Sequence, residues 1–393
     1  MSASTPAASI DRLILVTAAY FPDSYGGAER QAKILAEALG RLGVHVTIAA
    51  PTISPDAPLF EETEFGAVRR VRVAHYPNYG GLRMPSTLRW TRRLLKMFKR
   101  EEWAGVPVYV FHARLHALAA ALLSRQLRSP LVLKLGGGGE SSDFHALDEK
   151  RYFYGKIIKR YLLNQVDIFV SNGKQITQDL KGLGVASERI VEFFNGAILP
   201  NYHDVHSANM QKIGNKFIFT GRIIKDKNID LLFSAASEVA RHREVRFVIV
   251  GDGEEMGRLV HEAAHLGLSK SFDFTGFQSN VTERLLGCDF FISASTREGQ
   301  SNSLLEAMSC GCIPVVAAAS GVDDVVEDGK SGFIVKDVSA AAFIETINRV
   351  LDLSAEDRGK LSEASRSYAE NNFGIEAIAS RTISAISAAT TAQ

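Results

Sequence analysis

The sequence predicts an α/β protein built from two doubly wound domains. Short runs rich in β-branched residues alternate with amphipathic segments along the whole chain, a pattern typical of βα units around buried parallel sheets. A chain of 393 residues is too long for one ordinary core and suits two domains of similar size. A polar segment without periodicity, residues 196–215, is the expected linker. Parallel sheets bind ligands where their strands end, so we expect two facing Rossmann-like domains with an interdomain cleft.

The expected strands follow one another at regular intervals. In the first half they lie near residues 13–17, 44–49, 71–74, 106–111, 131–135, 166–171 and 190–194. In the second half they lie near residues 217–220, 245–250, 272–275, 289–293, 313–317 and 333–335. Residues 28–42 are expected to form a helix, because apolar residues recur at helical spacing and Gly43 follows as a stop signal. Helices over residues 355–371 and 375–388 are expected to end the chain.

Composition and charge exclude several classes of protein. The formal net charge of +1 gives no general attraction to nucleic acid, and we expect no nucleic-acid partner. Cys288, Cys310 and Cys312 fit neither a disulfide framework nor a zinc site, which indicates a reducing compartment. No apolar run approaches the ~18 residues that a membrane span requires. These features predict a cytoplasmic protein.

One stretch carries the strongest functional signal. Residues 289–317 read as a buried strand, a polar loop, a short helix ended by Gly311 and a second buried strand. Glu298 and Glu306 flank the start of this helix, whose free N–H groups can bind an anionic or hydroxyl-rich ligand such as a nucleotide sugar. The alternative is structural: Ser303 and Glu306 fit a capping box, and Glu298 fits a solvated loop carboxylate.

Two glycine-containing strand ends suit a diphosphate. Gly26 and Gly27 begin a helix where the backbone can approach a phosphate, and a tight βα turn is the alternative explanation of an isolated Gly-Gly pair. After the strand at 217–220, Arg222 can bind a diphosphate in a planar, bidentate manner and Lys227 can act as a point charge. Lys225 remains an alternative to Lys227, and the basic residues can also be merely solvated.

A third group of residues is expected on the acceptor side. The strand at 131–135 runs into four consecutive glycines, whose N–H groups can approach a sugar or a phosphate. Glu140 and Asp143 are candidates for an acceptor-side base, and His112 ends the neighbouring expected strand. A hydrogen-bonded structural role for His112 is the alternative. The acceptor-side candidates are therefore His112, Gly137, Gly138, Glu140 and Asp143.

Taken together, these motifs resemble the retaining glycosyltransferases of family 4, in which two Glu separated by seven residues lead into an Ala-Met-x-x-Gly helix. The resemblance implies the GT-B architecture, with Glu298 against the donor sugar and Glu306 on the ribose. It implies that Gly26 and Gly27 face the donor diphosphate, which Arg222 and Lys227 clamp. The remaining donor-binding residues that it implies are Gly221, Gly251, Phe277, Gly299, Gln300, Ser301, Asn302, Ser303 and Leu304.

The resemblance also implies domain boundaries. Residues 1–200 would form the acceptor-side domain, residues 201–374 the nucleotide-sugar domain, and residues 375–393 a helix returning to the first domain. The chain departs from the family at one point. Many members carry a His after the strand at 131–135, where this sequence has glycines, which puts a catalytic histidine at that position in doubt.

The implied activity is transfer of a sugar from a nucleotide diphosphate sugar to an acceptor hydroxyl with retention of configuration, with Arg222, Lys227 and Glu298 catalytic. The sequence has no Asp-x-Asp pair, so we expect no metal or other cofactor. The expected acceptor is a lipid-linked or surface-polysaccharide glycan. Alternatives are an epimerase or phosphorylase on the same fold and a non-enzymatic sugar-binding protein. The basic segment 88–100 suggests peripheral contact with the inner face of a membrane, with an ordinary surface helix as the alternative.

Overall fold

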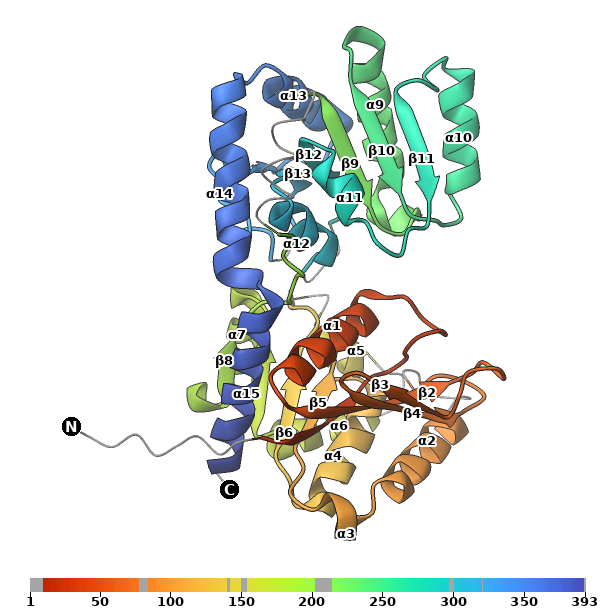
Figure 1. Ribbon diagram of the computed structural model, residues 1–393, viewed down its shortest axis with the longest axis vertical. Helices are drawn as coiled ribbons and strands as arrows, with labels where there is room; N and C mark the ends of the chain where they lie inside the picture. Colours follow the sequence, from red (N-terminus) through yellow and green to blue (C-terminus); the bar gives the residue numbers. More distant parts are fainter. Residues whose placement is uncertain are drawn as a thin grey trace, which may run out of the picture. The chain divides into compact units, whose positions relative to one another are not determined.

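The computed structural model describes residues 10–77, 84–139, 142–149, 154–201, 214–296, 300–319 and 321–391. The chain divides into two compact units, each with its own sheet (Figure 1). Unit 1 comprises Met1–Gly196 and Ile375–Gln393, and unit 2 comprises Ala197–Gly374. The first boundary lies four residues before the one expected at 200/201, since it follows Gly196. Residues 202–213, most of the expected linker, lie outside the described residues.

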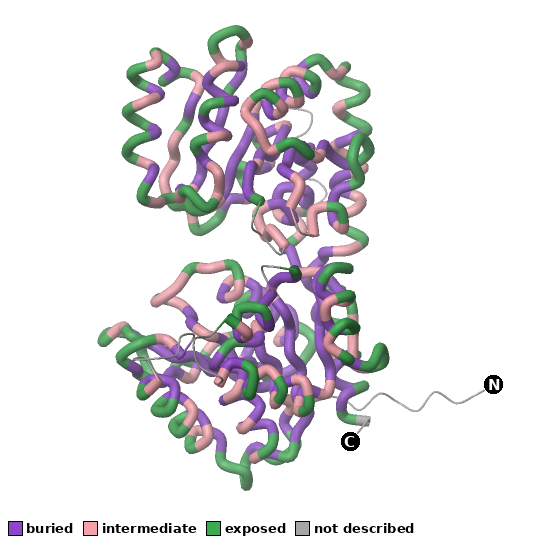
Figure 2. Tube along the Cα trace, turned by 180° about the vertical axis from the view of Figure 1, so that it is seen from behind, coloured by how far each residue is buried: buried purple, intermediate pink, exposed green. Residues whose placement is uncertain are grey.

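Unit 1 contains a sheet of eight strands in the order β3-β4-β2-β1-β5-β6-β7-β8. All neighbouring strands are parallel except β3, which pairs antiparallel with β4. The strands are β1 (Arg12–Val16), β2 (His45–Thr52), β3 (Phe60–Thr63), β4 (Gly66–Arg72), β5 (Val108–Phe111), β6 (Leu131–Lys134), β7 (Ile168–Ser171) and β8 (Ile190–Glu192). Strands β1, β2, β5, β6 and β7 are mainly buried, whereas β3 is exposed (Figure 2).

Helices cover both faces of this sheet. They are α1 (Gly27–Arg41), α2 (Met84–Met97), α3 (Arg100–Trp103), α4 (Leu115–Leu127), α5 (Asp143–Asp148), α6 (Tyr154–Gln165), α7 (Lys174–Gly182) and α15 (Ile375–Thr391). Helices α2, α4, α5 and α6 share one hydrophobic core, whereas α1 and α15 share another on the opposite side of the strands. The last helix of the chain therefore belongs to unit 1.

Unit 2 contains a fully parallel sheet of six strands in the order β11-β10-β9-β12-β13-β14. The strands are β9 (Lys216–Thr220), β10 (Arg246–Val250), β11 (Phe272–Gly276), β12 (Phe290–Ser293), β13 (Ile313–Ala317) and β14 (Phe333–Val335). Its helices are α9 (Ile229–His242), α10 (Met256–His265), α11 (Thr282–Leu286), α12 (Asn302–Ser309), α13 (Ala340–Leu351) and α14 (Ala355–Phe373), with a short 3₁₀ turn η4 (Lys225–Lys227) after β9. A buried row of stacked rings, Phe290, Phe217 and Phe247, joins three neighbouring strands, with centroids 4.7 and 5.2 Å apart.

Each sheet has one point where the direction of winding reverses. In unit 1 this point lies between β1 and β5, and in unit 2 it lies between β9 and β12. In doubly wound proteins, ligands bind outside the carboxyl ends of the strands at such a switch point. The residues that follow β1, β5, β9 and β12 are therefore the first candidates for a functional site.

Two strands differ from the sequence-based expectation. Strand β3 is not predicted by the sequence, and β4 begins at Gly66 instead of near residue 71. Strand β3 is an exposed, acidic edge strand, and arginines interrupt the apolar pattern of β4, so neither shows a regular alternation. Trp90 in α2 and Phe98 directly after it have no exposed surface, so the basic segment 88–100 does not present these aromatic rings on its outer face. Within the described ranges, no helix combines the length and hydropathy that crossing a bilayer requires.

Candidate functional site

Glycines extend the sheet of unit 2 beyond the ends of its strands. The N–H of Gly221 donates to the carbonyl of Val250 at 3.0 Å, and the N–H of Gly251 donates to that of Gly276 at 2.9 Å. A Cβ on Gly251 would lie only 1.8 Å from the carbonyl oxygen of Gly221, so no other residue fits there without movement. These neighbouring strand ends present bare backbone that a ligand can approach closely. Phe277, the next residue along the chain, is 58% exposed.

Two cations lie together directly after β9. Burial, and then the positive charge of Arg222, lower the pKa of Lys227 to about 8. The influence of Arg222 means that two like charges are held close to each other, an arrangement that a bound polyanion stabilises. Lys225, the sequence-based alternative, is 73% exposed and lies 3.9 Å from the carboxylate of Glu255. The structure thus distinguishes Lys225, which lies near an acid, from Lys227, whose pKa is lowered by burial and by Arg222 and raised to a smaller extent by Asp226.

The loop that carries Lys227 is attached to the end of β12 across the switch point. Asn228 adopts a left-handed conformation, with φ of 50°, and its side-chain amide donates to the carbonyl of Ala294 at 2.9 Å. Residue 294 begins the loop that leads to the helix α12. The predicted sugar-binding residues Glu298 and Gly299 lie outside the described residues, so the structure gives no position for them.

Helix α12 begins two residues earlier than a capping box of Ser303 and Glu306 would require. Ser301 is its N-cap, and the Ser301 hydroxyl accepts from the N–H of Leu304 at 3.4 Å. Ser303 lies inside the helix, and Glu306 falls in the second turn. The capping-box interpretation of Ser303 and Glu306 is therefore wrong, because Glu306 is too far along the helix to reach back to its start.

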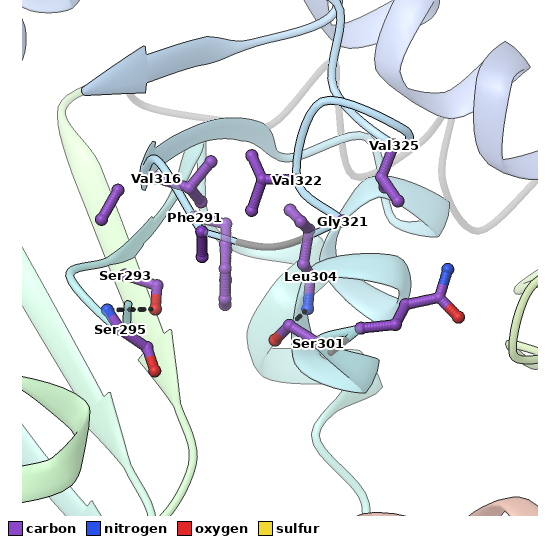
Figure 3. Close-up of a pocket in the computed structure, with 12 residues that line it drawn as sticks. Phe291, Ser293, Ser295, Ser301, Leu304, Val316, Gly321, Val322 and Val325 are labelled. Carbon is purple, nitrogen blue, oxygen red and sulfur yellow. Dashed lines mark hydrogen bonds between the residues drawn. The ribbon is translucent and has the colours of Figure 1, made fainter. Parts of the chain in front are cut away.

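A small pocket lies between the start of α12 and the ends of β12 and β13 (Figure 3). It holds about 370 Å³, counting space open to solvent. Its apolar wall includes Phe291, Val316, Val322 and Val325, and its polar side includes Ser293, Ser295, Gln300 and Ser301. The hydroxyl of Ser295 is buried and makes no hydrogen bond within the described part of the chain. Predicted donor-binding residues Gln300, Ser301 and Leu304 thus lie together at this edge of the sheet.

The glycines after β1 occupy the N-terminus of α1, as expected, but a carboxylate is already there. Gly26 is the N-cap of α1, and a Cβ on Gly26 would lie 2.4 Å from a carboxylate oxygen of Glu29. Glu29 is buried, with 9% of its surface exposed. Glycine at position 26 is therefore explained by the packing of Glu29, and the phosphate-facing role of Gly26 and Gly27 stays a prediction.

Asp143 joins the ends of β5 and β6. Its carboxylate accepts from the N–H groups of Gly136 at 3.0 Å and Ala113 at 3.3 Å, and it contacts His112 Nδ1 at 3.2 Å and Arg114 Nε at 3.4 Å. Burial alone would raise the pKa of Asp143, but the charge and hydrogen bond of His112, with Arg114 and Gly136, hold it well below its usual range. An anion stabilised in this way is a poor proton acceptor, which corrects the expectation that Asp143 acts as a base.

Two other acceptor-side candidates, Gly137 and Gly138, lie in the loop after β6. Gly138 packs against α7, where a Cβ on Gly138 would lie 3.0 Å from Cγ of Gln175. Gly137 lies between Gly138 and Gly136, the residue whose N–H binds Asp143. Glu140 lies outside the described residues.

The sequence analysis missed Lys134, the last residue of β6. Its side chain is buried, and Nζ donates to the carbonyl of Phe194 at 3.2 Å and lies 5.3 Å from the ring centroid of Phe193. Burial lowers the pKa of Lys134 to about 7. A charged residue within the apolar run Leu131–Leu135 is the signal that could have identified it. Across the described ranges, no group of three or more His, Cys, Asp or Glu is arranged to hold a metal ion.

Two family models match the chain, one in each unit. The family described as glycosyl transferases group 1 matches residues 201–368, and the glycosyl transferase 4-like domain matches residues 26–196. The chain belongs to the group 1 glycosyltransferases. Both units thus fall within one GT-B glycosyltransferase, as the resemblance of the sequence implied.

Individual group 1 glycosyltransferases and their structures extend this comparison. An uncharacterized glycosyltransferase from Methanocaldococcus jannaschii is 26% identical over 56% of this chain, and the match spans 58% of that relative's own length. The N-acetylgalactosamine-N,N'-diacetylbacillosaminyl-diphospho-undecaprenol 4-alpha-N-acetylgalactosaminyltransferase of Campylobacter jejuni is 24% identical over 79% of this chain and 83% of its own length. The crystal structure of Anabaena HepE in complex with UDP superimposes with a TM-score of 0.70 and 18% identity, covering 94% of this chain and 98% of HepE.

Proposed function

We propose that this glycosyltransferase transfers a sugar from a nucleotide diphosphate sugar to an acceptor hydroxyl, with retention of configuration and without a metal ion. The observation that carries the proposal is the pair Arg222 and Lys227, two neighbouring cations at the switch point of unit 2. Rupture of the bond between sugar and diphosphate develops negative charge on the leaving group. Fixed positive charges stabilise that charge more in the transition state than in the ground state, which accelerates the reaction.

The other donor residues have complementary roles in this proposal. Glu306, in the second turn of α12, binds the ribose hydroxyls, and Glu298 orients the donor sugar. The bare backbone of Gly221 and Gly251 allows close approach of the nucleotide, and Phe277 provides an exposed ring for its base. We infer a front-face displacement, in which the departing diphosphate assists the acceptor hydroxyl.

The relatives suggest chemical classes for both substrates. The Campylobacter jejuni enzyme is named for a diphospho-undecaprenol acceptor, and HepE was crystallised with UDP. We therefore propose a uridine diphosphate sugar as donor and a lipid-linked or surface-polysaccharide glycan as acceptor. Peripheral contact with the inner face of the membrane fits such an acceptor. The exposed cations of α2 and the turn after it support this contact: Arg89, Arg92, Arg93, Lys96, Lys99 and Arg100.

Replacing the two clamp cations separately tests the mechanism. We expect Arg222→Ala and Lys227→Ala each to lower kcat of sugar transfer about a hundredfold, because each removes a charge that stabilises the leaving group. Lys225→Ala is the matched control, since Lys225 belongs to the same 3₁₀ turn but faces Glu255. It should stay within about threefold of wild type, a change below 1 kcal/mol in the barrier.

Three outcomes would contradict parts of this proposal. Near-normal transfer by both alanine variants would exclude the cationic clamp. Loss of turnover in a chelator, restored by magnesium, would exclude the metal-independent mechanism. Turnover of the donor into an epimer or a sugar phosphate, without an external acceptor, would identify one of the alternative activities of the same fold.

A further inference from the structure

The imidazole of His112 lies where a side chain at position 136 would otherwise be. His112 follows β5 with φ of 67°, an uncommon left-handed conformation for a residue with a side chain. Its N–H donates to the carbonyl of Lys134 at 2.7 Å, so His112 continues the parallel pairing of β5 with β6. A Cβ on Gly136 would lie 1.9 Å from Cε1 and 2.0 Å from Nδ1 of His112. The ring can keep this orientation only because residue 136 is glycine.

The hydrogen bonds of Asp143 determine which ring nitrogen of His112 remains available. Since Asp143 is held as an anion, its carboxylate can only accept, and Nδ1 of His112 must carry the proton that joins them. When the ring is neutral, Nδ1 alone carries a proton and Nε2 keeps a lone pair, and Asp143 still has Arg114 and the N–H groups of Gly136 and Ala113 to hold it as an anion. Asp143 is itself fixed by Gly136, Ala113 and Arg114, so the ring orientation is fixed as well.

The orientation of the ring would matter little if it were fully enclosed. The His112 side chain keeps 25% of its surface exposed, whereas that of Asp143 keeps 4%. Within the described part of the chain, Nε2 of His112 makes no hydrogen bond, while Nδ1 is engaged. The ring also follows β5, one of the two strands at the switch point of unit 1, where doubly wound sheets bind ligands.

We propose that His112 contacts substrate, with Nε2 accepting a hydrogen bond from a carbohydrate hydroxyl, and that Asp143 and Gly136 are positioning residues for its ring. The inference rests on the proposed glycosyl transfer and deepens it by assigning a hydrogen-bond acceptor to unit 1. The hydroxyl belongs either to the acceptor or to the donor sugar, and steady-state kinetics separates the two. A rise in KM for the acceptor identifies the acceptor, and a rise in KM for the donor identifies the donor sugar.

The variant His112→Asn removes Nε2 while it preserves the surroundings. Asparagine tolerates the left-handed conformation, and its short amide can replace Nδ1 as a donor to Asp143, but it has no atom at the position of Nε2. We expect kcat/KM for transfer to fall about 10- to 100-fold, because a substrate hydroxyl loses its partner. The melting temperature and the affinity for the free nucleoside diphosphate should stay at the wild-type values.

A double-mutant cycle tests the role of Gly136. We expect Gly136→Ala to lower transfer by displacing the ring, and we expect His112→Gly combined with Gly136→Ala to be no worse than His112→Gly alone, since no ring remains to displace. Gly182→Ala is the matched control: Gly182 lies in α7, and nothing lies within 4 Å of its added Cβ. That control should transfer sugar at the wild-type rate.

Each result supports or overturns the inference. Full activity of His112→Asn, or independent losses from His112→Gly and Gly136→Ala, would exclude a substrate contact through this ring. Wild-type protein that binds no nucleoside diphosphate in calorimetry would instead overturn the proposed function itself, and the inference with it. Binding of UDP by wild type and by His112→Asn, with transfer lost only in the variant, is the result we expect.

Discussion

At the scale of single residues, the least expected group is the buried ammonium of Lys134. It lies at the end of β6 with a backbone carbonyl as its hydrogen-bond acceptor, and burial lowers its pKa to about 7 from an ordinary 10.5. Below pH 7 the folded protein must hold a charge in an apolar environment. Between pH 7 and 10.5 the unfolded chain binds this proton more strongly than the folded protein does. The contribution of Lys134 to the free energy of unfolding therefore rises with pH.

Substitution of Lys134 by methionine should remove this dependence. Methionine has a similar shape and no charge. Near pH 6, Lys134→Met should therefore avoid the cost of a buried charge, while it loses the hydrogen bond to the carbonyl of Phe194. The difference in unfolding free energy between the two proteins should shift in favour of wild type as pH rises from 7 to 9, by at most about 1.4 kcal/mol per pH unit. Urea denaturation at several pH values measures it. Parallel stability curves for the two proteins would contradict the burial of a titrating ammonium.

The contrast between Lys227 and Lys134 shows how much of the site the sequence predicts. Arg222 and Lys227 lie in one short loop after a strand, so local pattern alone brings both to the same edge. The partners of Lys134 and Asp143 come from other strands and loops, and their hydrogen bonds depend on the register of the sheet. The spacing of residues along the sequence does not indicate such contacts. For the same reason the sequence suggested Asp143 as a base, although the fold surrounds it with donors.

At the scale of elements, α2 shows how a sequence pattern can predict a helix and mispredict its surface. The basic segment 88–100 suggested a helix with a basic face, and Trp90 and Leu94 lie one turn apart on the buried face of α2. The same burial leaves the outer face to cations and to Leu88, which is 64% exposed. Any contact of α2 with a membrane must therefore be mainly electrostatic, since the aromatic residues that would insert into lipid belong to the core.

An electrostatic contact has a measurable signature. Neutralising four exposed cations of α2 should weaken binding to vesicles rich in anionic lipid roughly a hundredfold or more, since each cation near the surface contributes about 1 kcal/mol. The four substitutions are Arg89→Gln, Arg92→Gln, Arg93→Gln and Lys96→Gln. A control variant with the same change in charge neutralises other exposed cations of unit 1: Arg125, Lys156, Arg160 and Lys181. Flotation with equal losses in both variants, or with none in either, would contradict a specific contact through α2.

At the scale of the whole molecule, the order of elements along the chain differs from their order in space. Each unit has its own buried core, and the sequence predicts both sheets because parallel strands buried on two faces give clear apolar runs. Helix α15 follows unit 2 in the sequence but packs in unit 1, where Ile378 and Ile386 share a core with α1. Arg41 of α1 also contacts Glu376 of α15 at 2.8 Å. The apolar pattern of the last helix predicted its existence, whereas only the family resemblance suggested the unit to which it returns.

Deletion of residues 375–393 should therefore destabilise unit 1, most of which lies far away in the sequence. It should spare unit 2, which directly precedes these residues. Loss of α15 uncovers the apolar face of β6 and β7 and removes side chains such as Ile378, each of which contributes about 1.5–3 kcal/mol by burial. Hydrogen exchange should accelerate in α1, β6 and β7, while α9 and β9–β13 keep their protection because their core contains no residue of α15. The single substitution Ile378→Ala should produce the same regional pattern with a smaller amplitude, which separates loss of packing from nonspecific effects of truncation. Equal loss of protection in both units would show that the two cores unfold together, and the assignment of the last helix to unit 1 alone would then fail.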